Sequence, residues 1–88
     1  MNFEKARFNM LEQQIRPWRV VDADVLSLLS LVRREEFVPA ERRAFAFADI
    51  QIPLGFGAAM LAPKVEAQIL QALKVHRNEK VLEVGTGS

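Results

Sequence analysis

Gly85 and Gly87, in the sequence Val84-Gly-Thr-Gly87, are the residues whose type and spacing most clearly suggest chemistry. The short apolar run before them, residues 81–84, predicts a buried strand that ends in a glycine turn. Because glycine has no Cβ, such a turn lets the backbone approach a ligand closely, and nucleoside cofactors commonly bind there. A lone Gly-x-Gly is weak evidence, since the dinucleotide fingerprint also needs a third glycine and a later acidic residue. These residues alone therefore leave a cofactor site and a plain strand-ending turn equally open.

Composition restricts the kind of site that this chain can build. Its 88 residues include no cysteine and a single histidine, His76, which excludes disulfides, thiol nucleophiles and cysteine or histidine-cluster metal sites. A net charge of +1 gives no general attraction to nucleic acid. No apolar run approaches the roughly 18 residues of a membrane-spanning helix, and charges interrupt the place of a signal peptide's apolar region. We therefore expect a cytoplasmic protein without metal, nucleic-acid or membrane partners.

The first half of the chain is predicted to be helical. Behind the possible cap Asn2, an apolar stripe predicts a helix over residues 3–15: Phe8, Leu11 and Ile15, widened by Met10. Behind the possible cap Asp22, a second stripe predicts a core helix: Val25, Leu28, Leu29 and Val32. The mixed charges of Arg33–Glu36 are interpreted as a solvated helix end without chemistry. Trp18 is expected to cover the core at the corner after the first helix, and both Phe45 and Phe47 are expected inside the core.

The second half predicts a short strand, an unusual loop and another helix. Residues 49–52 alternate polar and apolar, and Pro53 would confine this strand to a sheet edge. The loop 54–62 is almost entirely apolar, so it should cover either a cofactor pocket or the core, and the residues leave both readings open. Pro63 suits the start of a helix that ends near Lys74. Its expected core face is Val65, Ile69, Ala72 and Leu73, with Gln68 and Gln71 outward.

This order of elements predicts a helical entry segment followed by the beginning of an α/β sheet. The connection 75–78, with His76, is expected to be a solvated loop.

Over nearly its whole length the sequence resembles the protein-L-isoaspartate O-methyltransferases. The matching segments are Met10–Arg16, Arg34–Pro39, Ala46–Asp49, Ile52–Gly57 with Pro63, and Lys80–Ser88. Members of this family use S-adenosylmethionine to methylate the abnormal carboxyl group of isoaspartyl residues, which starts the repair of damaged proteins. The resemblance implies that Glu83, Gly85 and Gly87 belong to the cofactor motif, whose backbone groups meet the methionine and adenosine portions of the ligand. It therefore favours a cofactor site over a plain turn.

The resemblance also implies a fold class and its division. The chain is expected to be the mostly α-helical amino-terminal segment of an α/β, Rossmann-like methyltransferase, truncated after the first sheet strand. Residues 1–62 would form a helical subdomain with a short edge strand and the apolar Gly-x-Gly loop. Residues 63–88 would supply the first helix and strand of the methyltransferase domain.

The sequence departs from the family where the reaction would occur. After the Gly-x-Gly loop the family usually has Gln-Thr-Ile-Ser, with its catalytic serine last, whereas this chain has Ala58-Ala-Met-Leu61. Neither alanine nor leucine can donate a hydrogen bond to a carboxylate, so Leu61 cannot take the role of the serine. We therefore assign no catalytic residue, and we expect cofactor binding by the full-length protein but poor isoaspartyl methylation.

Two classes of function follow from this sequence. The first is a methyltransferase, acting on isoaspartyl proteins or on a different substrate, of which this 88-residue chain would be an inactive part that does not bind S-adenosylmethionine by itself. The second is a non-catalytic helical module for protein contacts. The apolar strand 80–84 would lack neighbours in either case, so we expect it to be disordered or paired with another copy of the chain.

Overall fold

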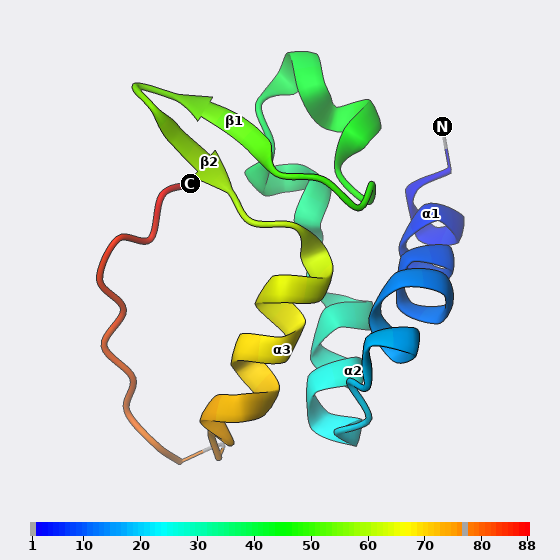
Figure 1. Ribbon diagram of the computed structural model, residues 1–88, viewed down its shortest axis with the longest axis vertical. Helices are drawn as coiled ribbons and strands as arrows, with labels where there is room; N and C mark the ends of the chain where they lie inside the picture. The colour runs from blue at the N-terminus through cyan, green and yellow to red at the C-terminus, as the bar shows by residue number, and fades with distance from the viewer. Residues whose placement is uncertain (1, 77) are drawn as a thin grey trace.

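A computed structural model describes residues 2–76 and 78–88 and shows three helices beside a two-stranded hairpin (Figure 1). Helix α1 (Phe3–Met10) starts at Asn2, whose Oδ1 accepts a hydrogen bond from Lys5 N at 3.1 Å. It continues as a π-helical turn, Leu11–Ile15, so the predicted helix over residues 3–15 is confirmed. A further 3-10 turn follows over Arg16–Trp18, with Pro17 in its first turn, where a residue without a backbone N–H is tolerated.

Helix α2 (Ala23–Leu31) has the predicted cap but not the predicted burial. Asp22 Oδ1 accepts hydrogen bonds from Asp24 N at 2.9 Å and Val25 N at 3.2 Å. Val25 packs against the core, whereas Leu28 is 48% exposed. The apolar stripe of α2 is therefore only partly covered by the rest of the chain. Short 3-10 turns, Arg34–Phe37 and Ala40–Phe45, connect α2 to the hairpin.

The hairpin consists of β1 (Ile52–Gly55) and β2 (Ala58–Met60), which pair antiparallel with Ile52 opposite Met60. The predicted strand over residues 49–52 is therefore wrong except for its last residue. Residues 55–57 all have positive φ, which lets this glycine-rich sequence reverse within a few residues. Phe56 at the tip is fully exposed, whereas Met60 packs against the core and Ala62 is buried, so only the end of the loop 54–62 covers the core.

The core lies where α1, the segment before the hairpin and α3 meet. Its fully buried members are Ile15, Val20, Ala46 and Ala67, and Ile52 anchors the base of the hairpin at 1% exposure. Phe47 is also buried, with its ring centroid 6.1 Å from that of Phe3. Phe45 is half exposed, so the prediction of two core phenylalanines holds only for Phe47. On α1, Phe8 is exposed, although Met10, Leu11 and Ile15 of the predicted stripe are buried.

Helix α3 (Pro63–Leu73) has its predicted bounds but presents its opposite face to the core. Val65, Ile69 and Leu73 are 37%, 47% and 59% exposed, whereas Ala67 is completely buried. The expected inward face is thus largely solvated. Figure 1 shows α3 beside α2.

Gln71 explains part of this orientation. Its Oε1 accepts hydrogen bonds from Val21 N at 2.8 Å and Asp22 N at 3.0 Å, and its Nε2 donates to Arg19 O at 3.0 Å. The amide thereby satisfies backbone groups in the corner that leads into α2. Gln68, expected outward as well, donates to Trp18 O at 3.3 Å.

The terminal segment after α3 contains no strand among its described residues. Val81, Leu82 and Val84 are 64%, 89% and 89% exposed, so the buried strand is not formed, and these residues lack a sheet neighbour as expected for this chain by itself. The segment has no strand neighbour, since the sheet of the described chain consists of β1 and β2 alone. His76 is exposed as predicted, and its backbone N–H donates to Glu79 Oε1 at 3.0 Å. None of the described helices is long and apolar enough to cross a membrane.

Candidate cofactor site and buried charge network

The terminal segment returns beside α3 toward the hairpin, where the carboxyl end of the chain lies near β2 (Figure 1). Gly85 and Gly87 have φ of 77° and 84°, in the left-handed region that favours glycine. A Cβ built on Gly87 would lie 3.3 Å from Leu54 Cδ1 of β1, whereas nothing lies within 4 Å of a Cβ at Gly85. The structure therefore brings the Gly-x-Gly turn into contact with the hairpin.

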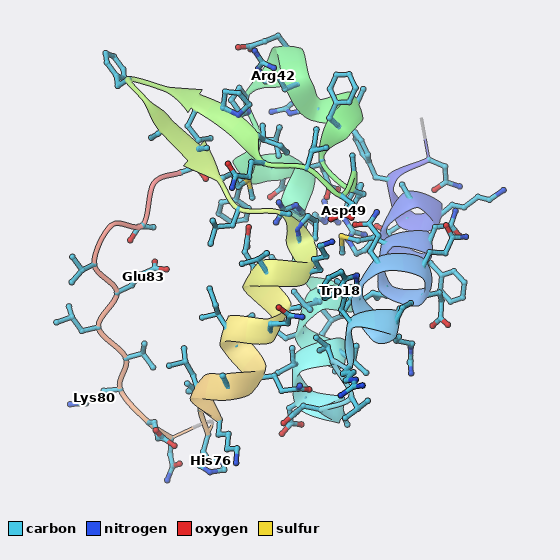
Figure 2. All side chains as sticks on the ribbon, in the orientation of Figure 1. Trp18, Arg42, Asp49, His76, Lys80 and Glu83 are labelled. Atoms are coloured by element: carbon cyan, nitrogen blue, oxygen red, sulfur yellow. The ribbon has the colours of Figure 1, made fainter. Side chains whose placement is uncertain are left out.

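Glu83, the third candidate cofactor residue, is exposed on the terminal segment, and Figure 2 shows it on the part that runs separately from α3. Its side chain forms no hydrogen bond or ion pair with any residue that the structure describes. The three candidate residues share one segment, and that segment alone does not enclose a ligand.

Leu61, which the resemblance places at the serine position of the family, directly follows β2 and is 39% exposed. Its carbonyl oxygen accepts a hydrogen bond from Arg34 NH2 at 2.8 Å. Arg34 also donates from Nε to Ala46 O at 2.6 Å and from NH1 to Glu66 Oε1 at 2.9 Å. One guanidinium therefore joins the segment before the hairpin, the end of β2 and the first turn of α3.

A second buried arginine, Arg7, pairs with Glu35. Arg7 NH2 donates to both carboxylate oxygens of Glu35, at 2.6 Å and 2.9 Å, and the two side chains are 3% and 11% exposed. Arg7 NH1 donates to Glu4 Oε1 at 2.6 Å, and its guanidinium carbon lies 5.2 Å from the centre of the Phe47 ring. The interpretation of residues 33–36 as a solvated helix end was therefore wrong for Arg34 and Glu35.

The pKa values of this pair shift in the directions that stabilise both charges. Burial alone would raise the pKa of Glu35, but hydrogen bonds from Arg7 and from its own backbone amide, with the charges of Arg7 and Arg33, lower it overall. Burial would likewise lower the pKa of Arg7, but its bonds to Glu4 and Glu35 and their charges raise it. Glu35 and Arg7 therefore form an ion pair at neutral pH.

The family of this chain follows from its similarity to known proteins. The sequence profile of the family described as protein-L-isoaspartate(D-aspartate) O-methyltransferase matches residues 5–88. The chain belongs to this family. All the segments that carried the resemblance, from Met10–Arg16 to Lys80–Ser88, lie within the matched region.

Relatives within the protein-L-isoaspartate O-methyltransferases confirm the assignment. The enzyme of Methylorubrum populi is 42% identical over 84 residues, covering 96% of this chain and 40% of the relative. The Petrotoga mobilis enzyme is 36% identical over 88 residues, which cover 100% of this chain and 41% of the relative. The Aeropyrum pernix enzyme is 41% identical over 86 residues, which cover 98% of this chain and 33% of the relative. The chain thus spans about two fifths or less of the length of these family members.

The buried charges of this family member were missed, although α1 carries a signal for them. Arg7 follows Phe3 by four residues and precedes Met10 by three, so it lies on the apolar face of the helix. An arginine on the apolar face of a helix indicates a buried charge, and a buried charge needs a carboxylate partner. Which acid supplies it depends on a contact between residues 28 positions apart.

Trp18, expected to cover the core, is 52% exposed. Its ring instead supports Lys64, whose Nζ lies 4.0 Å from the ring centre. Lys64 also pairs with Asp49 at 3.2 Å, so these three side chains, two of them labelled in Figure 2, connect the corner after α1 with the start of α3. Among the residues that the structure describes, no three His, Cys, Asp or Glu side chains lie together so that they could hold a metal ion.

Proposed function

We propose that residues 1–88 are the amino-terminal portion of an S-adenosylmethionine-dependent methyltransferase that acts on carboxyl groups of isoaspartyl proteins or peptides. The observation that carries this proposal is the family match over residues 5–88. Within it, residues 1–62 are the helical subdomain, and residues 63–88 contribute the first helix and first strand of a Rossmann-like sheet.

The exposed apolar surface supports this division. Val65, Ile69 and Leu73 on α3 and the apolar residues 81, 82 and 84 face solvent in the chain as it stands. Burying an aliphatic side chain of this size contributes about 1.5–3 kcal/mol, so a sheet that covered both segments would gain substantial stability. A helix with one apolar face and an apolar strand that follows it are the parts that α/β domains pack together.

Glu83, Gly85 and Gly87 are the proposed cofactor residues. The positive φ angles of both glycines and the space around Gly85 fit a backbone turn that a ligand approaches closely. The Glu83 carboxylate is an acceptor suited to hydroxyl or ammonium groups of such a ligand. When bound, S-adenosylmethionine supplies the methyl group on its sulfonium. The chain's own part is to hold the ligand by backbone N–H groups and this carboxylate.

Few residues of this chain indicate the chemical class of the methyl acceptor. Residues 58–61 offer apolar side chains and no side-chain donor. A carboxyl acceptor therefore meets no hydroxyl here that could orient it toward the sulfonium. This favours weak isoaspartyl methylation, with a methyltransferase for a different, less polar acceptor as the second candidate.

These proposals are tested on a completed protein, defined as residues 1–88 joined to the part of the Petrotoga mobilis relative that follows its matched region. We predict that the completed protein binds S-adenosylmethionine and that the isolated chain does not bind it more tightly than about 100 μM, or about 5.5 kcal/mol. A pocket must bury most of its ligand, and one exposed segment cannot do so. Calorimetric titration of both proteins measures the difference.

Matched substitutions in the completed protein assign the site. Gly85→Ala places a Cβ at a φ of 77°, so affinity should fall by about tenfold, whereas Thr86→Ala should change it little. Saturable binding by the isolated chain, or equal effects of the two substitutions, contradicts the proposed site. A completed protein that folds without binding the cofactor would favour the non-catalytic module.

Self-association of the isolated chain is a further prediction. The unpaired apolar segment 80–84 is a template for strand pairing with a second copy. Deleting residues 79–88 should leave the helices folded, by circular dichroism, and should abolish any dimer seen by sedimentation at several concentrations. Equal association of residues 1–78 and 1–88 would contradict this role of the terminal segment.

A further inference from the structure

We propose that Arg34 is a positioning residue that fixes the junction between hairpin β1–β2 and helix α3, and with it the side chain at position 61. This inference rests on the proposed function, because position 61 is where a methyl acceptor would be oriented. Arg34 itself touches no reacting group and acts through the backbone that it holds.

The geometry of Arg34 is that of a three-way clamp. Nε, NH1 and NH2 donate in different directions to Ala46 O, Glu66 Oε1 and Leu61 O, at 2.6, 2.9 and 2.8 Å. The residue is 8% exposed, so water competes weakly for these bonds, and hydrogen bonds from a charged donor are among the stronger ones. Leu61 precedes α3 and Glu66 lies in its first turn, so a single rigid group spans the strand-to-helix junction.

Packing also restrains this junction, because Met60 pairs with Ile52 and packs against the core, and Ala62 and Pro63 are buried. Ile52 holds the first strand in the core, but the tip around Phe56 is free in solvent. The ion pair of Lys64 with Asp49 is partly exposed, and pairs of that kind contribute little. Arg34 adds to this packing a direct hydrogen bond to the Leu61 carbonyl, and this bond joins position 61 to both Ala46 and Glu66.

The chain offers a matched control beside it. Arg33 has the same side chain, but it is 68% exposed and lies 3.6 Å from Glu36. Arg34→Lys keeps the charge of Arg34 but loses the planar fork, and one ammonium cannot reach three acceptors in these directions. Arg33→Lys applies the same chemical change at a position without the clamp.

The first measurement is amide hydrogen exchange on the 88-residue chain. Arg34→Lys should accelerate exchange of the amides in residues 58–66 by at least about tenfold, relative to those of α1, whereas Arg33→Lys should leave the pattern unchanged. Uniform acceleration throughout the chain, or none, overturns the inference, because a clamp acts locally.

The second measurement separates positioning from folding in the completed protein with Gln-Thr-Ile-Ser restored at residues 58–61. Arg34→Lys should lower kcat at saturating cofactor by about 100-fold, with the cofactor Kd unchanged. Cofactor stoichiometry gives the folded fraction, so a loss of folded protein with unchanged kcat per bound cofactor overturns the inference.

Two further outcomes are distinguishable. If the restored protein with Arg34 intact transfers no methyl group, the proposed function fails, while hydrogen exchange still decides whether Arg34 is a clamp. If Arg34→Lys does not fold, Glu66→Gln removes the charged partner at nearly constant size. That variant should accelerate exchange in residues 58–66, and an unchanged pattern overturns the inference.

Discussion

Restoring Gln-Thr-Ile-Ser at residues 58–61 of the completed protein is expected to raise its isoaspartyl methylation by about 100-fold or more. The substitutions are Ala58→Gln, Ala59→Thr, Met60→Ile and Leu61→Ser. The new glutamine, threonine and serine side chains supply hydrogen-bond donors for the substrate carboxylate, next to the hairpin turn at residues 55–57. The loss of one such donor commonly lowers a reaction rate by about 100- to 1,000-fold. Arg34 donates a hydrogen bond to the Leu61 carbonyl at 2.8 Å, so a serine introduced at this position would lie on a restrained backbone.

Transfer of labelled methyl groups to an isoaspartyl peptide measures this effect, with the aspartyl form of the same peptide as the control. The cofactor Kd should not change, because the proposed cofactor residues Glu83, Gly85 and Gly87 remain intact. A completed protein that methylates as fast without the substitutions as the Petrotoga mobilis enzyme would show that residues 58–61 are not needed. The single substitution Leu61→Ser measures how much of any gain in the methylation rate is due to the serine hydroxyl.

Replacing Glu35 by alanine is expected to lower the free energy of unfolding by about 3–5 kcal/mol. The substitution leaves Arg7 buried with only the exposed Glu4 as a charged partner, and an uncompensated buried charge is costly. That loss is comparable with the whole stability of a small domain. Glu36→Ala is the matched control, since Glu36 is 62% exposed and its pair with Arg33 should contribute at most about 1 kcal/mol.

The same pair predicts the pH dependence of stability. The pKa of Glu35 is lower in the folded chain than its ordinary value of 4.5, so its contribution is fully present above that value. Stability from this residue should fall as the pH drops below 4.5 and the carboxylate becomes protonated. The pKa of Arg7 is raised, so its guanidinium stays charged in acid and is left buried beside a protonated Glu35.

Urea unfolding at a series of pH values between neutral and strongly acidic tests this dependence. The wild-type curve should lose stability on acidification more steeply than that of Glu35→Gln, which cannot ionise at this position. Parallel curves for the two proteins would show that Glu35 does not govern acid stability. Glu36→Gln should follow the wild type, because that side chain is exposed.

Local patterns in the sequence were sufficient to predict where the helices begin and to which family the chain belongs. Asn2, Asp22 and Pro63 each begin a helix as predicted, because capping and the fixed φ of proline act within one turn of chain. The family follows from short segments that match in order, which requires no knowledge of their contacts. Gly85 and Gly87 adopt left-handed φ angles, which the sequence allows because glycine has no Cβ.

Tertiary contacts decided which surfaces are buried. The amphipathic pattern of α3 predicted Val65, Ile69 and Leu73 inside, but a helix buries its apolar face only when another element covers it, and the described chain contains none there. The same reason leaves residues 80–84 without strand structure, since a strand needs a neighbour for its hydrogen bonds. Arg34 and Glu35 became buried because acceptors and partners from distant segments surround them. Pairings between residues far apart in sequence depend on how the segments pack, and no local pattern in the chain specifies that packing.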